Sequence, residues 1–337
     1  MPWRVLYVDH ADLMGGAEQS LLLLLRHLDR DQVEPLLACG EDTPLARAAR
    51  EAGVPVAEVP MGQLRDRRVP WAPAVRLAQG GKILARLARA FGADLLHANV
   101  ARAAAYAAWA SVRAGVPLVW HVRDVHDTRR PDEWLLVQAL SRVAEGIVCI
   151  SRATARPLPA VARPKVRVVP NGLDPAQFDL ARAEPQALRA RWGAAPEEVW
   201  VGAVGWLAPW KQVEHVVEMA QRVAQECPEA RFVVVGEAAA PRYAPYVASL
   251  KTRAREALGE RMRFVGALPA EAMPSVMAAL DLLVHTARAE PFGRVLVEAM
   301  AMERPVVAYA DGGVPEVVSD GETGCLVPPG DVDALAR

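Results

Sequence analysis

Short runs of apolar residues alternate with longer amphipathic stretches along almost the whole chain. In the first half these runs are continuous and rich in β-branched residues, which is typical of strands covered on both faces of a sheet. The amphipathic segments between them are predicted to be helices, and several end at a glycine. We expect strands at 4–9, 34–40, 54–59, 93–99, 117–122, 146–151 and 166–172.

The same alternation restarts after a stretch rich in proline and alanine, with strands expected at 199–206, 230–237, 261–268, 281–287 and 305–311. Strands that alternate with helices are joined by right-handed crossovers into parallel sheets. The sequence therefore predicts an α/β protein of two doubly wound, Rossmann-like domains that face a cleft. We place the first domain at 1–172, a linker at 173–198 and the second domain at 199–337.

The last residues, PPGDVDALAR (328–337), contain an aspartate that could cap a helix, yet the chain ends about one turn later. A domain does not normally end so early in a helix. We therefore expect the C-terminal end of the second domain to be truncated.

The composition is that of an ordinary folded protein, with 52% hydrophobic and 23% charged residues. Four cysteines lie far apart without a CxxC pair, which indicates buried apolar residues in a reducing compartment rather than disulfides or zinc ligands. The N-terminus is predicted to be a strand rather than a signal peptide. The run LLLLL (21–25) is far shorter than the roughly 20 residues of a membrane span. We expect a cytoplasmic protein.

Charge is spread unevenly, with a basic first half and an acidic second half. Residues 64–91 combine arginines with a helix that carries Lys82, Arg86 and Arg89 among apolar residues. A basic amphipathic helix can lie on anionic lipid, so the protein could be peripheral at the inner face of the membrane. Alternatively, the basic residues are the solvated face of a helix packed on its own core, which we favour slightly. No nucleic-acid partner is predicted.

Two carboxylates stand out in RAEPFGRVLVEAMA (288–301), where Glu290 and Glu298 flank the predicted start of a helix at Gly293. The first amides of a helix have no internal partner and suit an anion or hydroxyls, and Gly293 lets a ligand approach the backbone. Carboxylates only accept hydrogen bonds, so they require donors such as sugar hydroxyls. The pattern suggests a ligand with both phosphates and sugar hydroxyls. Alternatively, the two glutamates are solvated charges around an ordinary helix start.

A second candidate is VGAVGWLAPWKQ (201–212), in which a strand is followed by Gly205, a loop and Lys211. The glycine permits close approach of a ligand, and a compact ammonium is a common phosphate binder. Lysine is rare here, with only four in the chain. A surface lysine at a helix start is the alternative, although the helix dipole slightly disfavours it.

The first domain offers two further candidates at strand ends. Gly15 and Gly16 form a turn from the first strand into a helix, where a phosphate or sugar could approach the backbone. His121 lies at the carboxyl end of a strand and is expected to point into the cleft. The full GxGxxG dinucleotide motif is absent.

Taken together, these features resemble the retaining, nucleotide-sugar-dependent glycosyltransferases of family 4, which have the GT-B fold. The resemblance runs through the chain in the family's order and rests on GGAEQS (15–20), His121, CIS (149–151), VVPNGLD (168–174), GWLAPWK (205–211), FVGAL (264–268), EPFGRVLVE (290–298), DGGVPEVV (311–318) and DGETGCLVPPGD (320–331).

The resemblance implies transfer of a sugar from a nucleoside diphosphate-sugar to an acceptor, which we expect to be a cell-envelope glycan or glycolipid. Lys211 would hold the diphosphate, Glu298 the ribose and Glu290 the donor sugar. His121 would contact the donor sugar as a positioning group, and Gly16 would close on the diphosphate. The remaining residues implied to meet the donor are Gly15, Gly205, Leu268, Phe292, Gly293, Arg294 and Val295.

One departure from the family pattern is Trp206, at the place where an arginine usually joins the lysine on the diphosphate. Either Lys211 works alone, or Arg294 compensates, or activity is low. No cofactor and no metal are expected, since Asp29/Asp31 and Asp331/Asp333 look like caps or loop acids. The rival functions are a GT-B nucleotide-sugar epimerase, a phosphorylase and a catalytically weak nucleotide-sugar binding protein. The oligomeric state is left open.

Overall fold

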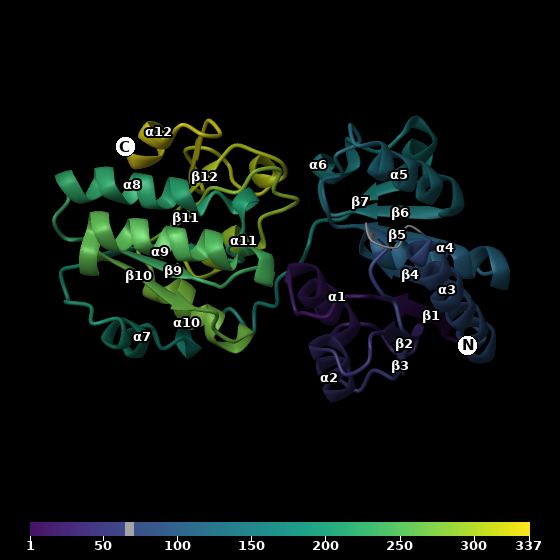
Figure 1. Cartoon of the computed structure of the whole chain (residues 1–337). Helices are drawn as coiled ribbons and strands as arrows, with labels where there is room; N and C mark the ends of the chain where they lie inside the picture. Colours follow the sequence, from purple (N-terminus) through teal and green to yellow (C-terminus); the bar gives the residue numbers. More distant parts are fainter. Residues whose placement is uncertain (65–70) are drawn as a thin grey trace. The chain divides into compact units, whose positions relative to one another are not determined.

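Seven parallel strands form the sheet of the first unit, Met1–Gly172, in the order β3-β2-β1-β4-β5-β6-β7 (Figure 1). The computed structural model describes residues 1–64 and 71–337. The strands are β1 (Trp3–Val8), β2 (Val33–Cys39), β3 (Val56–Glu58), β4 (Leu95–Asn99), β5 (Leu118–Val122), β6 (Gly146–Cys149) and β7 (Val166–Val168). Apolar side chains of both faces are buried, as Leu6 and Tyr7 illustrate, so the continuous apolar runs have the predicted cause.

Helices cover both faces of this sheet. The core of one face includes residues of α1 (Gly16–Arg26) and α2 (Pro44–Glu51). The core of the other face includes residues of α3 (Ala72–Phe91), α4 (Val100–Ala114) and α5 (Pro131–Val143), and the short α6 (Arg152–Ala155) follows β6. On α3, Leu84 is fully buried while Lys82, Arg86 and Arg89 are exposed, as expected for a helix packed on its own core.

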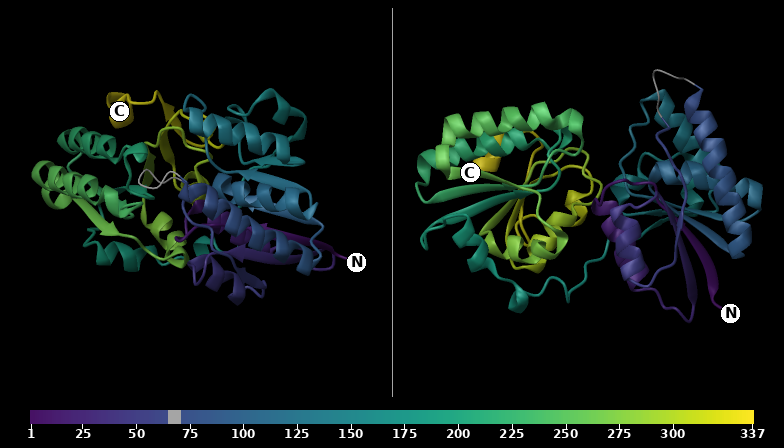
Figure 2. Two further views of the ribbon diagram at one scale, coloured as in Figure 1. Left: turned by 45° about the vertical axis from the view of Figure 1, so that its right-hand side comes forward. Right: turned by 60° about the horizontal axis from the view of Figure 1, so that its bottom comes forward.

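Six parallel strands form the sheet of the second unit, Leu173–Arg337, in the order β10-β9-β8-β11-β12-β13. They are β8 (Val199–Val204), β9 (Ala230–Val235), β10 (Met262–Gly266), β11 (Leu282–His285), β12 (Val306–Tyr309) and β13 (Cys325–Val327). One face packs against α8 (Val213–Glu226), α9 (Ala244–Leu258) and α12 (Val332–Ala336). The other packs against α7 (Pro185–Arg191), α10 (Met273–Ala279) and α11 (Arg294–Ala301), and Figure 2 shows helices on both faces.

The prediction of two doubly wound, Rossmann-like units is confirmed, and β13 is the one strand of the described residues that the sequence did not indicate. It is only three residues long and none of its side chains is fully buried, so its apolar pattern is weak. The stretch 173–198, expected as a linker, contains α7, which packs against α10 of the second unit. Cys39 and Cys149 are buried as expected, whereas Cys325 is exposed.

Each sheet contains one point where the strand order reverses direction, between β1 and β4 in the first unit and between β8 and β11 in the second. In open parallel sheets, ligands bind beside the carboxyl ends of the strands at such a point. The loops after these four strands are therefore the places to look for a functional site. None of the described helices is both long enough and apolar enough to cross a membrane.

Candidate functional site

An ion pair between Lys211 and Glu290 lies at the switch point of the second sheet. Lys211 ends a short 3₁₀ turn that follows β8, and Glu290 lies in the loop between β11 and α11. The lysine Nζ donates to the Glu290 Oε2 over 2.6 Å. His285, the last residue of β11, places its Nε2 3.1 Å from the same carboxylate oxygen. The fold thus brings together two residues that are 79 positions apart in the sequence.

Glu290 is a buried carboxylate that stays ionised because of its neighbours. Only 8% of the residue is exposed, and burial alone would raise its pKa. The Lys211 ammonium and the His285 hydrogen bond outweigh burial, so the pKa of Glu290 lies well below its usual value. A charged, fixed carboxylate can therefore orient Lys211 for an anionic ligand.

The loop after β11 folds back on the start of α11. Gly293 has a left-handed backbone with φ of 91°, and its N–H donates to the Glu290 Oε1 over 3.2 Å. A Cβ at this glycine would lie 2.8 Å from the Leu296 side chain, so this turn favours glycine on two grounds. Helix α11 begins at Arg294 immediately after it, which places a helix N-terminus beside the Lys211–Glu290 pair.

Glu298 lies one turn into α11 and is also buried, with 6% exposed. Its Oε1 accepts a hydrogen bond of 3.2 Å from the Arg294 Nη2, four residues earlier on the same helix. Burial raises the pKa of Glu298, and Arg294 opposes that rise. The two glutamates of the sequence pattern thus have different partners and opposite pKa shifts.

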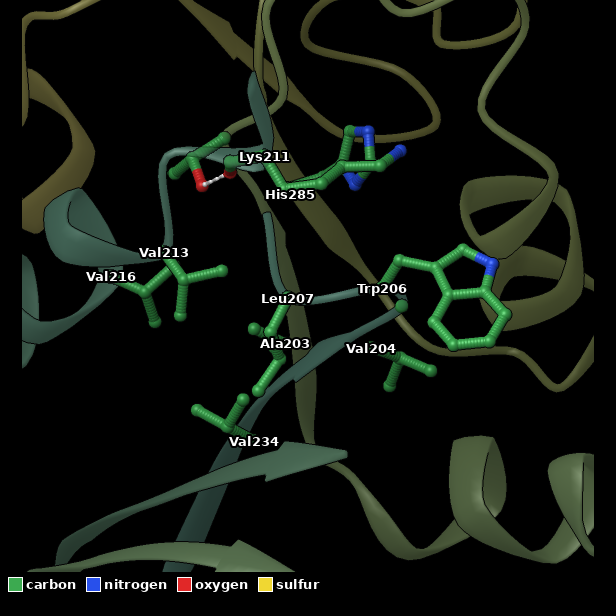
Figure 3. A pocket seen from close by; sticks show the side chains of 11 residues that line it. Ala203, Val204, Trp206, Leu207, Lys211, Val213, Val216, Val234 and His285 are labelled. Carbon is green, nitrogen blue, oxygen red and sulfur yellow. Dashed lines mark hydrogen bonds between the residues drawn. The ribbon is translucent and has the colours of Figure 1, made fainter. Parts of the chain in front are cut away.

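A pocket beside the ion pair is lined by Ala203, Val204, Gly205, Trp206, Leu207, Lys211, Val213, Val216, Val234, His285 and Thr286 (Figure 3). Its lower wall is apolar, and the stems of Lys211 and His285 lie together above it. The Thr286 hydroxyl donates to the Lys211 carbonyl over 2.8 Å, which fixes the backbone of the loop that carries the lysine. Trp206 lies at the side of this pocket.

Gly312 and Gly313 contact the backbone of Glu290, a role that the sequence did not suggest. The Gly313 N–H donates to the Glu290 carbonyl over 2.7 Å. A Cβ at Gly312 would lie 2.1 Å from that carbonyl oxygen, and Gly312 also has a left-handed φ of 61°. Only glycine allows the two loops to approach so closely.

We therefore expect Gly312→Ala to displace Glu290 and to lower both stability and turnover. Strain at such a backbone position costs about 1–3 kcal/mol. Thermal unfolding and steady-state kinetics of the variant measure the two effects. Gly321→Ala is a matched control, because that glycine also has positive φ but has open space around its Cβ. Equal losses in the two variants would contradict a specific role for the contact with Glu290.

Of the predicted residues of the first unit, Gly15 and Gly16 follow β1, one of the two strands at the switch point, and His121 lies in β5, which is next to β4. The Gly15 N–H donates to the Glu18 Oε2 over 2.8 Å, and Gly16 begins α1. Glu18 is 7% exposed, and burial together with nearby Asp9 raises its pKa to about 7. His121 in β5 is 8% exposed and contacts His97 and Arg123.

Three other predicted donor contacts have side chains turned into the protein. Phe292 is buried, with 7% of the residue exposed. Leu268 and Val295 are half-buried beside the core that includes residues of α10 and α11. These residues could meet a ligand mainly through their backbone groups.

Sequence reasoning missed His285, Thr286, Asn99 and Arg123. All four are polar residues at the ends of apolar strands. In a doubly wound sheet, polar residues at this edge point toward the ligand side. Among such residues, the sequence pattern singles out His121, Lys211 and Glu290.

Two family models match the chain, one on each unit. Glycosyltransferase Family 4 matches residues 14–177, and Glycosyl transferases group 1 matches residues 185–337. These matched ranges contain every candidate residue described above.

The chain is similar to several characterised proteins. It is 35% identical over 202 residues to a 2-deoxystreptamine glucosyltransferase of Streptomyces kanamyceticus, covering 58% of this chain and 50% of that protein. It is 28% identical to a GDP-mannose-dependent alpha-mannosyltransferase of Mycobacterium tuberculosis, covering 95% of this chain and 82% of that protein. The chain thus spans about half the length of the first of these relatives.

Solved structures share the fold over nearly the whole chain. The crystal structure of Anabaena Alr3699/HepE in complex with UDP-glucose has a TM-score of 0.82 and 27% identity, and the alignment covers 99% of this chain and 87% of HepE. Because one family model lies on each unit and the fold agrees throughout, the chain belongs to the group 1, family 4 glycosyltransferases of the GT-B fold.

Proposed function

We propose that the chain transfers a sugar from a nucleoside diphosphate-sugar to an acceptor, with retention of configuration at the anomeric carbon. The observation that carries this proposal is the Lys211–Glu290 pair at the β8/β11 switch point, beside the N-terminus of α11. HepE, which has the same fold, binds UDP-glucose. The acceptor proposed is a cell-envelope glycan or glycolipid.

Lys211 can hold a diphosphate without releasing Glu290. An ammonium group has three N–H donors, and Glu290 uses one of them. The remaining donors can meet phosphate oxygens, and the start of α11 adds a favourable dipole. As the glycosyl–phosphate bond breaks, charge grows on the leaving diphosphate, and these groups stabilise it.

Glu290 keeps limited capacity for a sugar hydroxyl. Its Oε2 already accepts from Lys211 and from His285, and its Oε1 accepts from the Gly293 N–H. A carboxylate has about four lone-pair sites, so one on Oε1 is left for a donor hydroxyl. Glu298 is proposed to accept from the ribose hydroxyls after exchanging part of its contact with Arg294.

The decisive experiment incubates the protein with UDP-glucose and, separately, GDP-mannose, with and without a membrane-lipid extract as acceptor, and identifies products by NMR. A glycosylated acceptor with the donor's anomeric configuration is expected. An altered free nucleotide sugar without acceptor would indicate an epimerase. Calorimetric binding of donor with neither transfer nor hydrolysis would indicate a binding protein.

Activity is expected to persist in excess EDTA, because Lys211 and the helix amides supply the positive potential at the diphosphate. The acidic pairs considered above have structural roles: the Asp331 Oδ1 caps α12 through Ala334 N at 2.8 Å, and the Asp29 Oδ1 accepts from Asp31 N at 3.0 Å. Initial rates before and after chelation, with added Mg²⁺ as a control, measure this. Complete loss of turnover that Mg²⁺ restores would contradict it.

Trp206→Arg is expected to raise kcat about 10-fold. A neutral indole cannot offset charge on the diphosphate, whereas a guanidinium beside Lys211 adds a charge-assisted hydrogen bond. Trp210→Arg, an exposed tryptophan in the same loop, is the matched control. An unchanged or lower kcat in Trp206→Arg would contradict this expectation and would show that an arginine at this position does not assist turnover.

A further inference from the structure

Two groups converge on one nitrogen of His121 in the first unit. The His97 Nε2 lies 3.1 Å from the His121 Nδ1, and the Arg123 Nη2 lies 3.4 Å from the same atom. His97 lies in the middle of β4, His121 lies near the end of β5 and Arg123 directly follows β5, and β4 is one of the two strands at the switch point of the sheet.

The identity of these groups determines where the proton of His121 lies. A guanidinium has only donors, so the His121 Nδ1 that faces it must be the acceptor and carries no proton. A neutral imidazole then has its proton on Nε2. Since the Nδ1 of His121 accepts, the Nε2 of His97 must donate to it.

Arg123 is held in place by a chain of buried polar contacts. Its Nε donates to the Asn99 Oδ1, and its Nη1 donates to the Asn171 Oδ1 over 2.8 Å. The Asn99 Nδ2 in turn donates to the Asp9 Oδ2 over 2.6 Å, which links the buried guanidinium to a buried carboxylate. The side of Arg123 that faces His121 is thereby fixed by residues from two strand ends, those of β1 and β4, and by a residue of the loop after β7.

The other nitrogen of His121 lacks a protein partner. The His121 Nε2 is buried and makes no hydrogen bond within the described residues. Buried polar atoms nearly always have a hydrogen-bond partner. A buried nitrogen without one, in a strand beside the switch point, suggests that a ligand supplies the partner. Burial first, and then the charges of Arg123 and His97, lower the pKa of His121 to about 2, in agreement with a neutral ring.

We propose that Arg123 and His97 are positioning residues that fix His121 as the neutral Nε2–H tautomer, so that it presents a hydrogen-bond donor, not a base, to a ligand oxygen. Its use in sugar transfer rests on the proposed function, whereas the tautomer does not. Among the described residues, the ionisable groups that act on His121 are Arg123 and His97, and Arg123 in turn interacts with Asp9 and with Glu18 of α1. Because the pKa of Glu18 is raised to about 7, a pH profile of activity alone would not report on His121.

The test is two-dimensional NMR of protein labelled with ¹⁵N-histidine, which shows the nitrogen that carries each proton, with His121→Asn to assign the signal. A neutral ring protonated on Nε2 between pH 8 and 5.5 is expected. A proton on Nδ1, or an imidazolium at pH 7, would overturn the proposal. This measurement on the unaltered chain requires neither turnover nor a donor, so its failure is distinct from failure of the proposed function.

Variants test the role of Arg123 itself. In Arg123→Gln the side-chain carbonyl can accept, so the Nδ1–H form should appear in the spectrum and kcat should fall by roughly 3- to 10-fold, the worth of one hydrogen bond. Arg123→Lys keeps a cationic donor and should restore both. Arg129→Gln, an exposed arginine of the same loop, is the control and should change neither. An Nε2–H signal unchanged in Arg123→Gln would show that Arg123 does not fix the tautomer.

Discussion

Lys211→Ala should lower kcat for sugar transfer about 100- to 1000-fold while the chain stays folded, which is the usual loss when one group that stabilises a developing anion is removed. The lysine is partly exposed, with 23% of its side chain accessible, so its removal leaves no large cavity. Glu290 keeps two of its three partners, His285 and the Gly293 N–H.

Saturating-donor kinetics measure this effect, and Lys251→Ala is the matched control because Lys251 is an exposed lysine of α9. The kcat of Lys211→Arg should lie between those of Lys211→Ala and Lys251→Ala. Arginine keeps the positive charge but replaces the compact ammonium by a planar guanidinium. Near-normal turnover in Lys211→Ala would show that Lys211 does not stabilise the leaving diphosphate.

Glu290→Gln should have the second-largest effect, because one neutral amide replaces a carboxylate that accepts from Lys211, His285 and the Gly293 N–H. A hydrogen bond to a charged group contributes about 1.5–3 kcal/mol to the free energy of unfolding. We expect the variant to lose about that amount of stability at pH 7 and to lose turnover, since Lys211 is no longer oriented.

The stability loss should depend on pH in a defined direction. The folded-state pKa of Glu290 is below its unfolded value, so its contribution is complete above the ordinary glutamate range near pH 4.5. It is then lost as pH falls toward the depressed folded pKa. The difference in unfolding free energy between wild type and Glu290→Gln should therefore shrink from pH 6 to pH 3.

Urea unfolding at several pH values measures that difference, and Glu256→Gln, an exposed glutamate of α9, is the control. A difference that stays constant from pH 6 to pH 3 would show that the charge of Glu290 does not contribute to folding. The contribution of Glu298 to the free energy of unfolding should change with pH in the opposite direction, because burial raises its pKa.

Much of the fold could be predicted from the sequence because a strand buried on both faces has a continuous apolar run that is hard to mistake, as Val201 and Leu283 illustrate. The β13 strand was not predicted because it has only three residues, of which one is exposed and two are half-buried. Residues 173–198 looked like a linker because they are rich in proline and alanine, yet α7 gains its place from packing on α10.

The sequence indicated after which strands the candidate residues lie, but not which of them contact one another. Lys211 and Glu290 follow β8 and β11, and the carboxyl-edge rule places both at one switch point. The sequence assigned them to different parts of the ligand, and nothing in it indicated that they pair with each other over 2.6 Å.

Long-range contacts were the least accessible to sequence reasoning. Asp9 and Asn99 are 90 positions apart, and Arg123 and Asn171 are 48 apart. The first pair meets because β1 and β4 are neighbours in the sheet, and the second because β7 lies two strands from β5. The strand order is a property of the whole unit. The close approach of Gly312 to Glu290 has the same origin.

The central claim is that Lys211 and the start of α11 bind the diphosphate of a nucleotide sugar, and a crystal structure of the protein with UDP tests it most directly. The account predicts a phosphate oxygen within hydrogen-bond distance of the Lys211 Nζ and of the first amides of α11, with the ribose on Glu298. A nucleotide bound elsewhere, with the Lys211–Glu290 and Arg294–Glu298 pairs untouched by it, would contradict the account.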